Sequence, residues 1–124
     1  MEKVYTSNAP EAIGPYSQAI KTGNLVFTSG QIAINPATGN VESTTIEGQT
    51  EQIMKNLGEV LKASGASFDT AVKTVCFLAN MDDFAKFNEV YGKYFTSKPA
   101  RSCVAVKTLP KNVLAEVEVI AEVL

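Results

Sequence analysis

The chain has 124 residues, of which 45% are hydrophobic and 19% are charged, and its formal net charge is −2. This length and composition predict one globular domain, residues 1–124, with a core that needs no disulfide or structural metal. The slightly acidic balance, without a run of Lys or Arg, disfavours a nucleic-acid surface. The absence of histidine excludes Ser-His-Asp and Cys-His nucleophile systems and the imidazole ligands of most catalytic zinc sites.

Targeting signals and disulfides are not predicted. No apolar run approaches the roughly 20 residues of a membrane-spanning helix, so no membrane insertion is expected. Cys76 and Cys103 lie far apart and form no Cys-x-x-Cys pair, and residues 1–5 lack the apolar stretch of a signal peptide. We therefore expect two reduced thiols in a cytoplasmic protein.

The first third of the chain is predicted to be mainly extended. Residues 16–20, 25–28 and 31–34 favour strands, and residues 35–40 are typical of a turn. A rigid loop is expected at 13–15, because a proline restricts the residue before it. This loop is a candidate for the lip of a site.

A long amphipathic helix is predicted to follow. Thr44 and Glu47 have the spacing of a capping box, and apolar residues recur at helical spacing over 46–61. Gly65 is expected to end the helix.

The second half is predicted to contain a strand, a helix and two further strands. Residues 72–78 form a strand that is apolar on both alternating faces from residue 75, as in a strand covered on both sides. Asp82 or Asp83 can cap the helix. Its apolar face consists of Phe84, Phe87, Tyr91, Tyr94 and Phe95. The last strands, 101–106 and 114–123, are separated by a proline-containing turn.

This order of elements indicates an α+β domain with one mixed β-sheet and two α-helices on one face. Two helices cannot cover both faces of the sheet. Because the strand at 72–78 is expected to be buried on both sides, the uncovered face is predicted to contact another subunit.

The last two strands carry the main polar constellation of the sequence. Alternation places Arg101 and Cys103 on one face of their strand, and Glu116 and Glu118 on one face of the next. If the valines that alternate with these residues pack under the helices, the four polar side chains point away from the helices, on the uncovered face of the sheet. The same pattern fits a cross-strand ion pair between Arg101 and a glutamate, and it fits a Cys103 that is a small buried hydrophobe.

Four further residues have both a structural and a functional interpretation. Tyr16 either packs its ring in a loop or contacts a ligand. Ser29 and Gly30 form either a turn or a hydrogen-bonding cradle. Asn88, on the second helix, is either solvated or bonded locally, or it faces a site.

Several of these segments resemble the RidA/YjgF family of small reactive-intermediate deaminases. The resemblance spans nearly the whole chain and rests on Ile13-Gly14-Pro15-Tyr16-Ser17-Gln18, Thr28-Ser29-Gly30-Gln31-Ile32, Phe84 with Asn88 and Tyr91, Pro99-Ala100-Arg101-Ser102-Cys103-Val104, and Leu109-Pro110-Lys111 followed by Glu116-Val117-Glu118. The Gly-Pro-Tyr-Ser-Gln and Pro-Ala-Arg-Ser-Cys-Val strings are specific when they occur together in this order.

The resemblance implies a chorismate-mutase-like fold and a homotrimer with clefts between subunits. It implies hydrolysis of enamine and imine intermediates, such as 2-aminoacrylate, 2-iminopropanoate and 2-iminobutanoate, to 2-keto acids and ammonia. By this resemblance Arg101 binds the substrate carboxylate, the backbone of Cys103 contacts the imine nitrogen, and Glu116 orients or activates water. The residues that would line the cleft and contact substrate are Tyr16, Ser29, Gly30 and Asn88.

The implied chemistry needs no cofactor and no metal, because the C=N carbon of a protonated 2-imino acid accepts water readily. Two other classes of function remain open. The protein could sense a small carboxylate metabolite or dock a partner as a regulator. It could also act on RNA as a ribonuclease or translation inhibitor, although the acidic balance and the absent histidine weigh against this.

Overall fold

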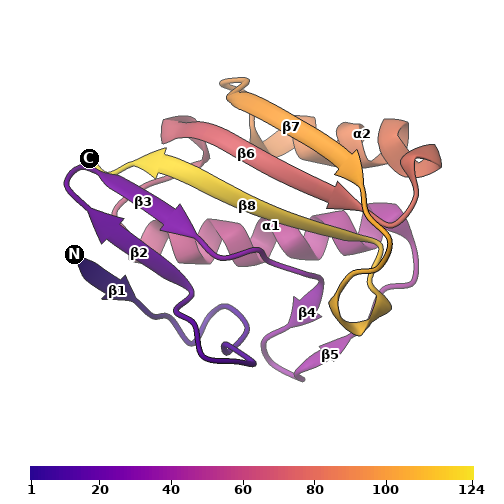
Figure 1. Ribbon diagram of the computed structural model, residues 1–124, viewed down its shortest axis with the longest axis horizontal. Coiled ribbons are helices and arrows are strands. Elements are labelled where there is room, and N and C mark those ends of the chain that lie inside the picture. The colour runs from indigo at the N-terminus through magenta and orange to yellow at the C-terminus, as the bar shows by residue number, and fades with distance from the viewer.

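The computed structural model describes all 124 residues. Its main sheet consists of β1 (Glu2–Val4), β2 (Ala19–Thr22), β3 (Leu25–Thr28), β6 (Ala71–Leu78), β7 (Ala100–Ala105) and β8 (Ala115–Glu122). A small ribbon pairs β4 (Ile34–Asn35) with β5 (Asn40–Val41), and the helices are α1 (Ile46–Ala63) and α2 (Phe84–Tyr94). The strand order is β1-β2-β3-β8-β6-β7, with β7 parallel to β6 and the other pairs antiparallel. Both helices lie on the same side of this mixed sheet, which confirms the predicted α+β class (Figure 1).

The N-terminal strands differ from the prediction in position and extent. The strand expected at 16–20 begins only at Ala19. The strand expected at 31–34 is largely irregular, because Gln31 makes an isolated bridge to Val117 and regular pairing resumes only at Ile34. The turn at 35–40 is confirmed as the connection between β4 and β5.

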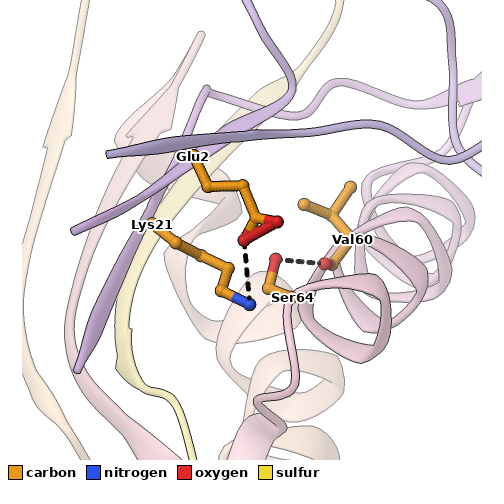
Figure 2. Close-up of polar contacts among 4 residues, drawn as sticks. All are labelled: Glu2, Lys21, Val60 and Ser64. Carbon is orange, nitrogen blue, oxygen red and sulfur yellow. Dashed lines mark hydrogen bonds and ion pairs between the residues drawn. The ribbon is translucent and has the colours of Figure 1, made fainter. Parts of the chain in front are cut away.

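Helix α1 begins one residue later than the predicted capping box implies. The cap is Thr45, whose hydroxyl accepts a hydrogen bond from the Gly48 amide at 3.1 Å, so the prediction of Thr44 was wrong. Gly65 follows the helix with a φ of +79°, a conformation that glycine adopts without strain. At the same end, the Ser64 hydroxyl donates to the Val60 carbonyl, close to the ion pair between Glu2 and Lys21 (Figure 2).

Helix α2 begins through a 3₁₀ turn at Met81–Asp83. The side chain of Asn80 accepts from the Asp82 amide at 2.9 Å. Asp83 occupies the N-cap position of α2, as one of the two predicted alternatives, but its side chain makes no capping hydrogen bond. The expected aromatic face is present, because Phe87 is fully buried and Tyr91 nearly so.

The two faces of the sheet have different surroundings. Toward the helices, alternate residues of β6 and β8 are fully buried: Thr74, Cys76, Leu78, Val117 and Val119. On the opposite face Val75 and Phe77 are half-buried, while Phe27 is 40% and Val104 48% exposed. Within one chain, the helices therefore cover a single face. No helix is long and apolar enough to cross a membrane.

Candidate functional site

Arg101 and Glu116 lie on opposite faces of the sheet, which corrects the predicted arrangement. Arg101 is paired in register with the buried Thr74, and its Cζ atom lies 4.9 Å from the ring centroid of Tyr91 on α2. Glu116 and Glu118 flank the buried Val117 on β8, so they point away from the helices. The shared outward face for Arg101, Cys103, Glu116 and Glu118 was therefore wrong.

The arginine side chain explains this orientation of β7. Its flat guanidinium also lies over the Phe84 ring, with 5.4 Å between Cζ and the centroid. A guanidinium with an aliphatic stem can cover aromatic rings as an apolar residue would. Val104, expected under the helices, is instead on the open face.

Arg101 and Asn88 lie in a groove of about 440 Å³ between α2 and the start of β7, which Thr96 and Lys98 also line. Arg101 Nη1 donates to Asn88 Oδ1 at 2.7 Å. The chain contains one ion pair, between Glu2 and Lys21, so the alternative of a cross-strand pair between Arg101 and a glutamate is wrong. Most N–H donors of the guanidinium remain free to bind an anion. We call this surface the Arg101 groove.

A second cavity, the Glu116 cleft, brings together Tyr16, Ser29, Gly30 and Glu116. It encloses about 420 Å³, and Glu118 also lines it. Burial and the neighbouring Glu118 raise the pKa of the Glu116 carboxyl above its usual value. A Glu116 with a raised pKa can exchange a proton near neutral pH more readily than an exposed carboxylate.

Gly30 is in direct contact with the Glu116 carboxyl. A Cβ atom added at Gly30 would lie 2.0 Å from Glu116 Oε2 and 2.7 Å from Cδ. The absence of a side chain at position 30 therefore allows the carboxyl group to rest against the backbone. This contact limits the positions that the Glu116 carboxyl group can occupy in the cleft.

The hydroxyls of Ser29 and Tyr16 are engaged within the lip of the cleft. Ser29 Oγ donates to the Ser17 carbonyl at 2.6 Å. Tyr16 OH accepts from the Ile13 amide at 3.3 Å, and its ring is 48% exposed. Both residues therefore shape the 13–17 segment that borders the cleft.

Two buried amide side chains hold the irregular walls of this cleft, and sequence reasoning missed both. Gln18 Nε2 donates to the Pro10 carbonyl at 2.8 Å, and its Oε1 accepts from the Thr6 amide at 2.7 Å. Asn56 Nδ2 donates to the carbonyls of Ile32 at 3.2 Å and Ile34 at 2.9 Å. The signal for Asn56 was a polar residue inside the apolar stripe of α1.

Cys103 packs beside Cys76 against the core, as expected for a small hydrophobe. Burial raises the pKa of the Cys103 thiol, although Arg101 opposes this, and burial raises the pKa of Cys76 to about 12. Both cysteines are free thiols. Because a thiolate is the reactive form, these thiols are poor nucleophiles at neutral pH.

The chain contains no cluster of three or more Cys, Asp or Glu side chains arranged to bind a metal ion. The fold and the two cavities define a small α+β protein with a free arginine on one surface and a carboxyl-lined cleft on another. The family model described as Endoribonuclease L-PSP matches residues 6–123. The chain therefore belongs to the YjgF/RidA family, as its motifs predicted.

Related proteins place a deaminase within this family. Reactive Intermediate Deaminase A, chloroplastic, of Arabidopsis thaliana is 53% identical over 97% of this chain and 65% of its own length. A RutC family protein of Pyrococcus horikoshii is 51% identical over 97% of this chain and 96% of its own. The crystal structure of Escherichia coli TdcF with bound serine superposes with a TM-score of 0.93 at 39% identity, covering 98% of each chain. Deamination of reactive intermediates is thus supported for the family.

Proposed function

We propose that this chain hydrolyses 2-imino acids and their enamine tautomers, such as 2-aminoacrylate, 2-iminopropanoate and 2-iminobutanoate, to 2-keto acids and ammonia. The observation that carries this proposal is the guanidinium of Arg101. It lies over two aromatic rings, it is held by Asn88, and it has no carboxylate partner. A planar cation fixed in this way matches the carboxylate common to all 2-imino acids.

We further propose that each complete site forms between two subunits of a homotrimer. A substrate of a few carbon atoms cannot contact both Arg101 and Glu116 of one chain, because they lie on opposite faces of the sheet. A head-to-tail interface that closes into a ring brings the Arg101 groove of one subunit against the Glu116 cleft of the next. The half-buried apolar residues on the open sheet face, Val75 and Phe77 among them, support such an interface.

In this site Arg101 binds the substrate carboxylate and so fixes the position of the imine carbon. Glu116 accepts a proton from water as the water oxygen attacks the carbon of the protonated C=N group. Glu116 then returns that proton to the nitrogen of the carbinolamine. As the C–N bond breaks and ammonia leaves, the hydroxyl group gives its proton to Glu116 and becomes the carbonyl of the 2-keto acid. General acid–base transfer of this kind typically contributes ~10² to 10⁴-fold to the rate.

The direct test measures keto acid formation from freshly generated 2-iminobutanoate, with and without the protein. We expect clear acceleration by the wild-type chain, and large losses in Arg101→Ala and in Glu116→Gln. A wild-type rate equal to the spontaneous rate would contradict the proposed function and would favour a carboxylate-sensing regulator.

A mixing experiment tests the shared site. Arg101→Ala and Glu116→Gln chains are unfolded together and refolded, so that subunits exchange at random. If each site takes one residue from each of two neighbours in a ring of three, an equal mixture regains about one quarter of wild-type activity. If both residues act within one chain, the mixture stays as inactive as its parents.

The description of the matching family model keeps RNA cleavage as a second candidate. The acidic composition and the carboxyl-lined cleft disfavour a phosphate-rich ligand. Incubation of the same preparations with labelled RNA tests this candidate. Cleavage that disappears in Glu116→Gln would support it over deamination.

A further inference from the structure

Two buried hydroxyl groups lie beneath Arg101. Thr74 on β6 is fully buried, Tyr91 on α2 is 8% exposed, and their hydroxyl oxygens are 2.7 Å apart. Burying hydroxyls costs free energy unless they are hydrogen-bonded, and here each has the other as its close partner. Neither group takes part in the proposed reaction, although the pair adjoins the residue that binds the substrate.

The hydroxyl bond fixes the position of the outer end of the Tyr91 ring. One contact of the ring is Phe95, which stacks on it with centroids 4.6 Å apart and planes 26° apart. Phe87 packs at 5.7 Å. These two rings hold the plane of the Tyr91 ring, and the hydrogen bond to Thr74 prevents the tip of the ring from swinging away from β6.

The Tyr91 ring in turn limits the orientation of the guanidinium. Asn88 holds Arg101 at a single nitrogen, Nη1, and the group can still turn about that bond. The ring 4.9 Å from Cζ supplies a flat surface that restricts this rotation. Because bidentate binding of a carboxylate requires a fixed plane, the ring affects substrate binding through the orientation that it gives to Arg101.

We propose that Thr74 and Tyr91 are positioning residues of the carboxylate site. Their hydroxyl bond anchors the Tyr91 ring in its place beneath the guanidinium, and the anchored ring sets the plane of the Arg101 guanidinium. The kinetic consequence rests on the proposed function, but the effect on the arginine does not. The experiment therefore includes one readout on the arginine itself and one on turnover.

Three variants separate the hydroxyl bond from packing. Thr74→Val removes the hydroxyl with little change in shape, and Thr74→Ser keeps it while removing a methyl group. Tyr91→Phe removes the other hydroxyl and keeps the ring, which provides a second test if Thr74→Val folds poorly. Thr50→Val is the matched control, because Thr50 is also fully buried and its hydroxyl bonds only within α1, to the Ile46 carbonyl.

The first readout is the NMR signal of the Arg101 Nε–H group, identified by its loss in Arg101→Lys. Nearby aromatic rings shift this signal, so it reports how the guanidinium lies on Tyr91. We expect it to move in Thr74→Val and Tyr91→Phe, and to stay near its wild-type position in Thr74→Ser and Thr50→Val. An unmoved signal in both Thr74→Val and Tyr91→Phe would overturn the proposal, whether or not the chain turns over imines.

The second readout is the division of the kinetic effect between KM and kcat. We expect Thr74→Val and Tyr91→Phe to raise KM for 2-iminobutanoate about three- to tenfold with kcat within about twofold of wild type. Thr50→Val is expected to lower the melting temperature and to leave KM at its wild-type value. Equal KM values in Thr74→Val and Thr50→Val, or a KM in Thr74→Ser as high as in Thr74→Val, would refute a role for the hydroxyl bond.

Discussion

Replacement of Gly30 by alanine is expected to separate catalysis from stability. The new Cβ atom would lie 2.0 Å from Glu116 Oε2, whereas ordinary contact begins near 3.4 Å, so the carboxyl group must retreat by about 1.4 Å. A misplacement of about 1 Å can cost ~10²-fold in rate. We therefore expect kcat/KM to fall about 10²-fold, equivalent to about 2.7 kcal/mol of transition-state stabilisation.

The stability of Gly30→Ala should change little. Gly30 is not among the glycines with a positive φ, so its backbone conformation accepts alanine. Restricting the unfolded chain typically adds about 0.4 to 1 kcal/mol, which offsets part of the cost of moving the flexible Glu116 side chain. The melting temperature is thus expected to stay within a few degrees of wild type, or about 1 kcal/mol in free energy of unfolding.

The assay combines keto acid formation from 2-iminobutanoate with a thermal melt. Gly58→Ala is the matched control, because its new Cβ atom also meets a side chain, the Phe68 ring at 3.2 Å, but lies on α1 outside the cleft. Gly58→Ala should keep full activity. Full activity in Gly30→Ala would refute the idea that contact with this backbone positions Glu116 for catalysis.

Four further predictions concern the same site. Arg101→Lys and Arg101→Ala should remain folded in a thermal melt yet lose at least about tenfold in kcat/KM, because a point charge cannot replace the planar fork; near-normal turnover of Arg101→Ala would end the carboxylate-binding role. Because Glu116 must be ionised to accept a proton, kcat/KM should rise with pH through its raised pKa. Glu118→Gln should move that rise to lower pH in a pH–rate profile, and an unshifted profile would show that Glu118 does not affect the base. Cys103→Ala should keep activity within about threefold, since burial raises the pKa of its thiol; complete loss with an intact fold would favour covalent catalysis. Exhaustive chelation and dialysis should leave the rate unchanged, and a loss restored by one metal would contradict the proposed chemistry.

The raised pKa of Glu116 also affects stability. A carboxyl group whose pKa is raised by folding holds its proton more tightly in the folded chain than in the unfolded chain. The protonated group therefore adds to stability in acid, and this contribution is lost as the pH rises from the usual pKa through the raised one. Glu116→Gln should therefore melt at a higher temperature than wild type at neutral pH, and this advantage should shrink in acid. Equal melting temperatures across that range would show that the carboxyl is not desolvated.

The order of elements could be predicted from sequence because each long element has one clear period. Helix α1 and strand β8 bury regularly spaced apolar residues, and both were predicted within two residues of their ends. The helix caps were less certain, since Thr44 and Thr45 are adjacent and both fit the N-cap preference. Short irregular segments such as 31–34 depend on tertiary anchors like Asn56, which local patterns do not reveal.

The alternation of residues in β7 could not predict which face of the strand lies toward the helices. Its sequence places an apolar residue in both registers, and an arginine can be either solvent-exposed or stacked on rings. What decides the register is the aromatic surface formed by Phe84 and Tyr91 on a separate helix. The candidate residues therefore stay a prediction as a set, and their division between two surfaces required the structure.

Under the proposed function, the placement of Arg101 and Glu116 on opposite faces gives the isolated chain a complete fold but an incomplete site. In the proposed trimer, dilution below the dissociation constant would abolish activity long before it affected secondary structure. Far below that concentration, the rate should increase more steeply than in direct proportion to the chain concentration, because a single chain contains no complete site. Turnover would then measure assembly, and any agent that loosens the subunits would act as an inhibitor without entering a cavity.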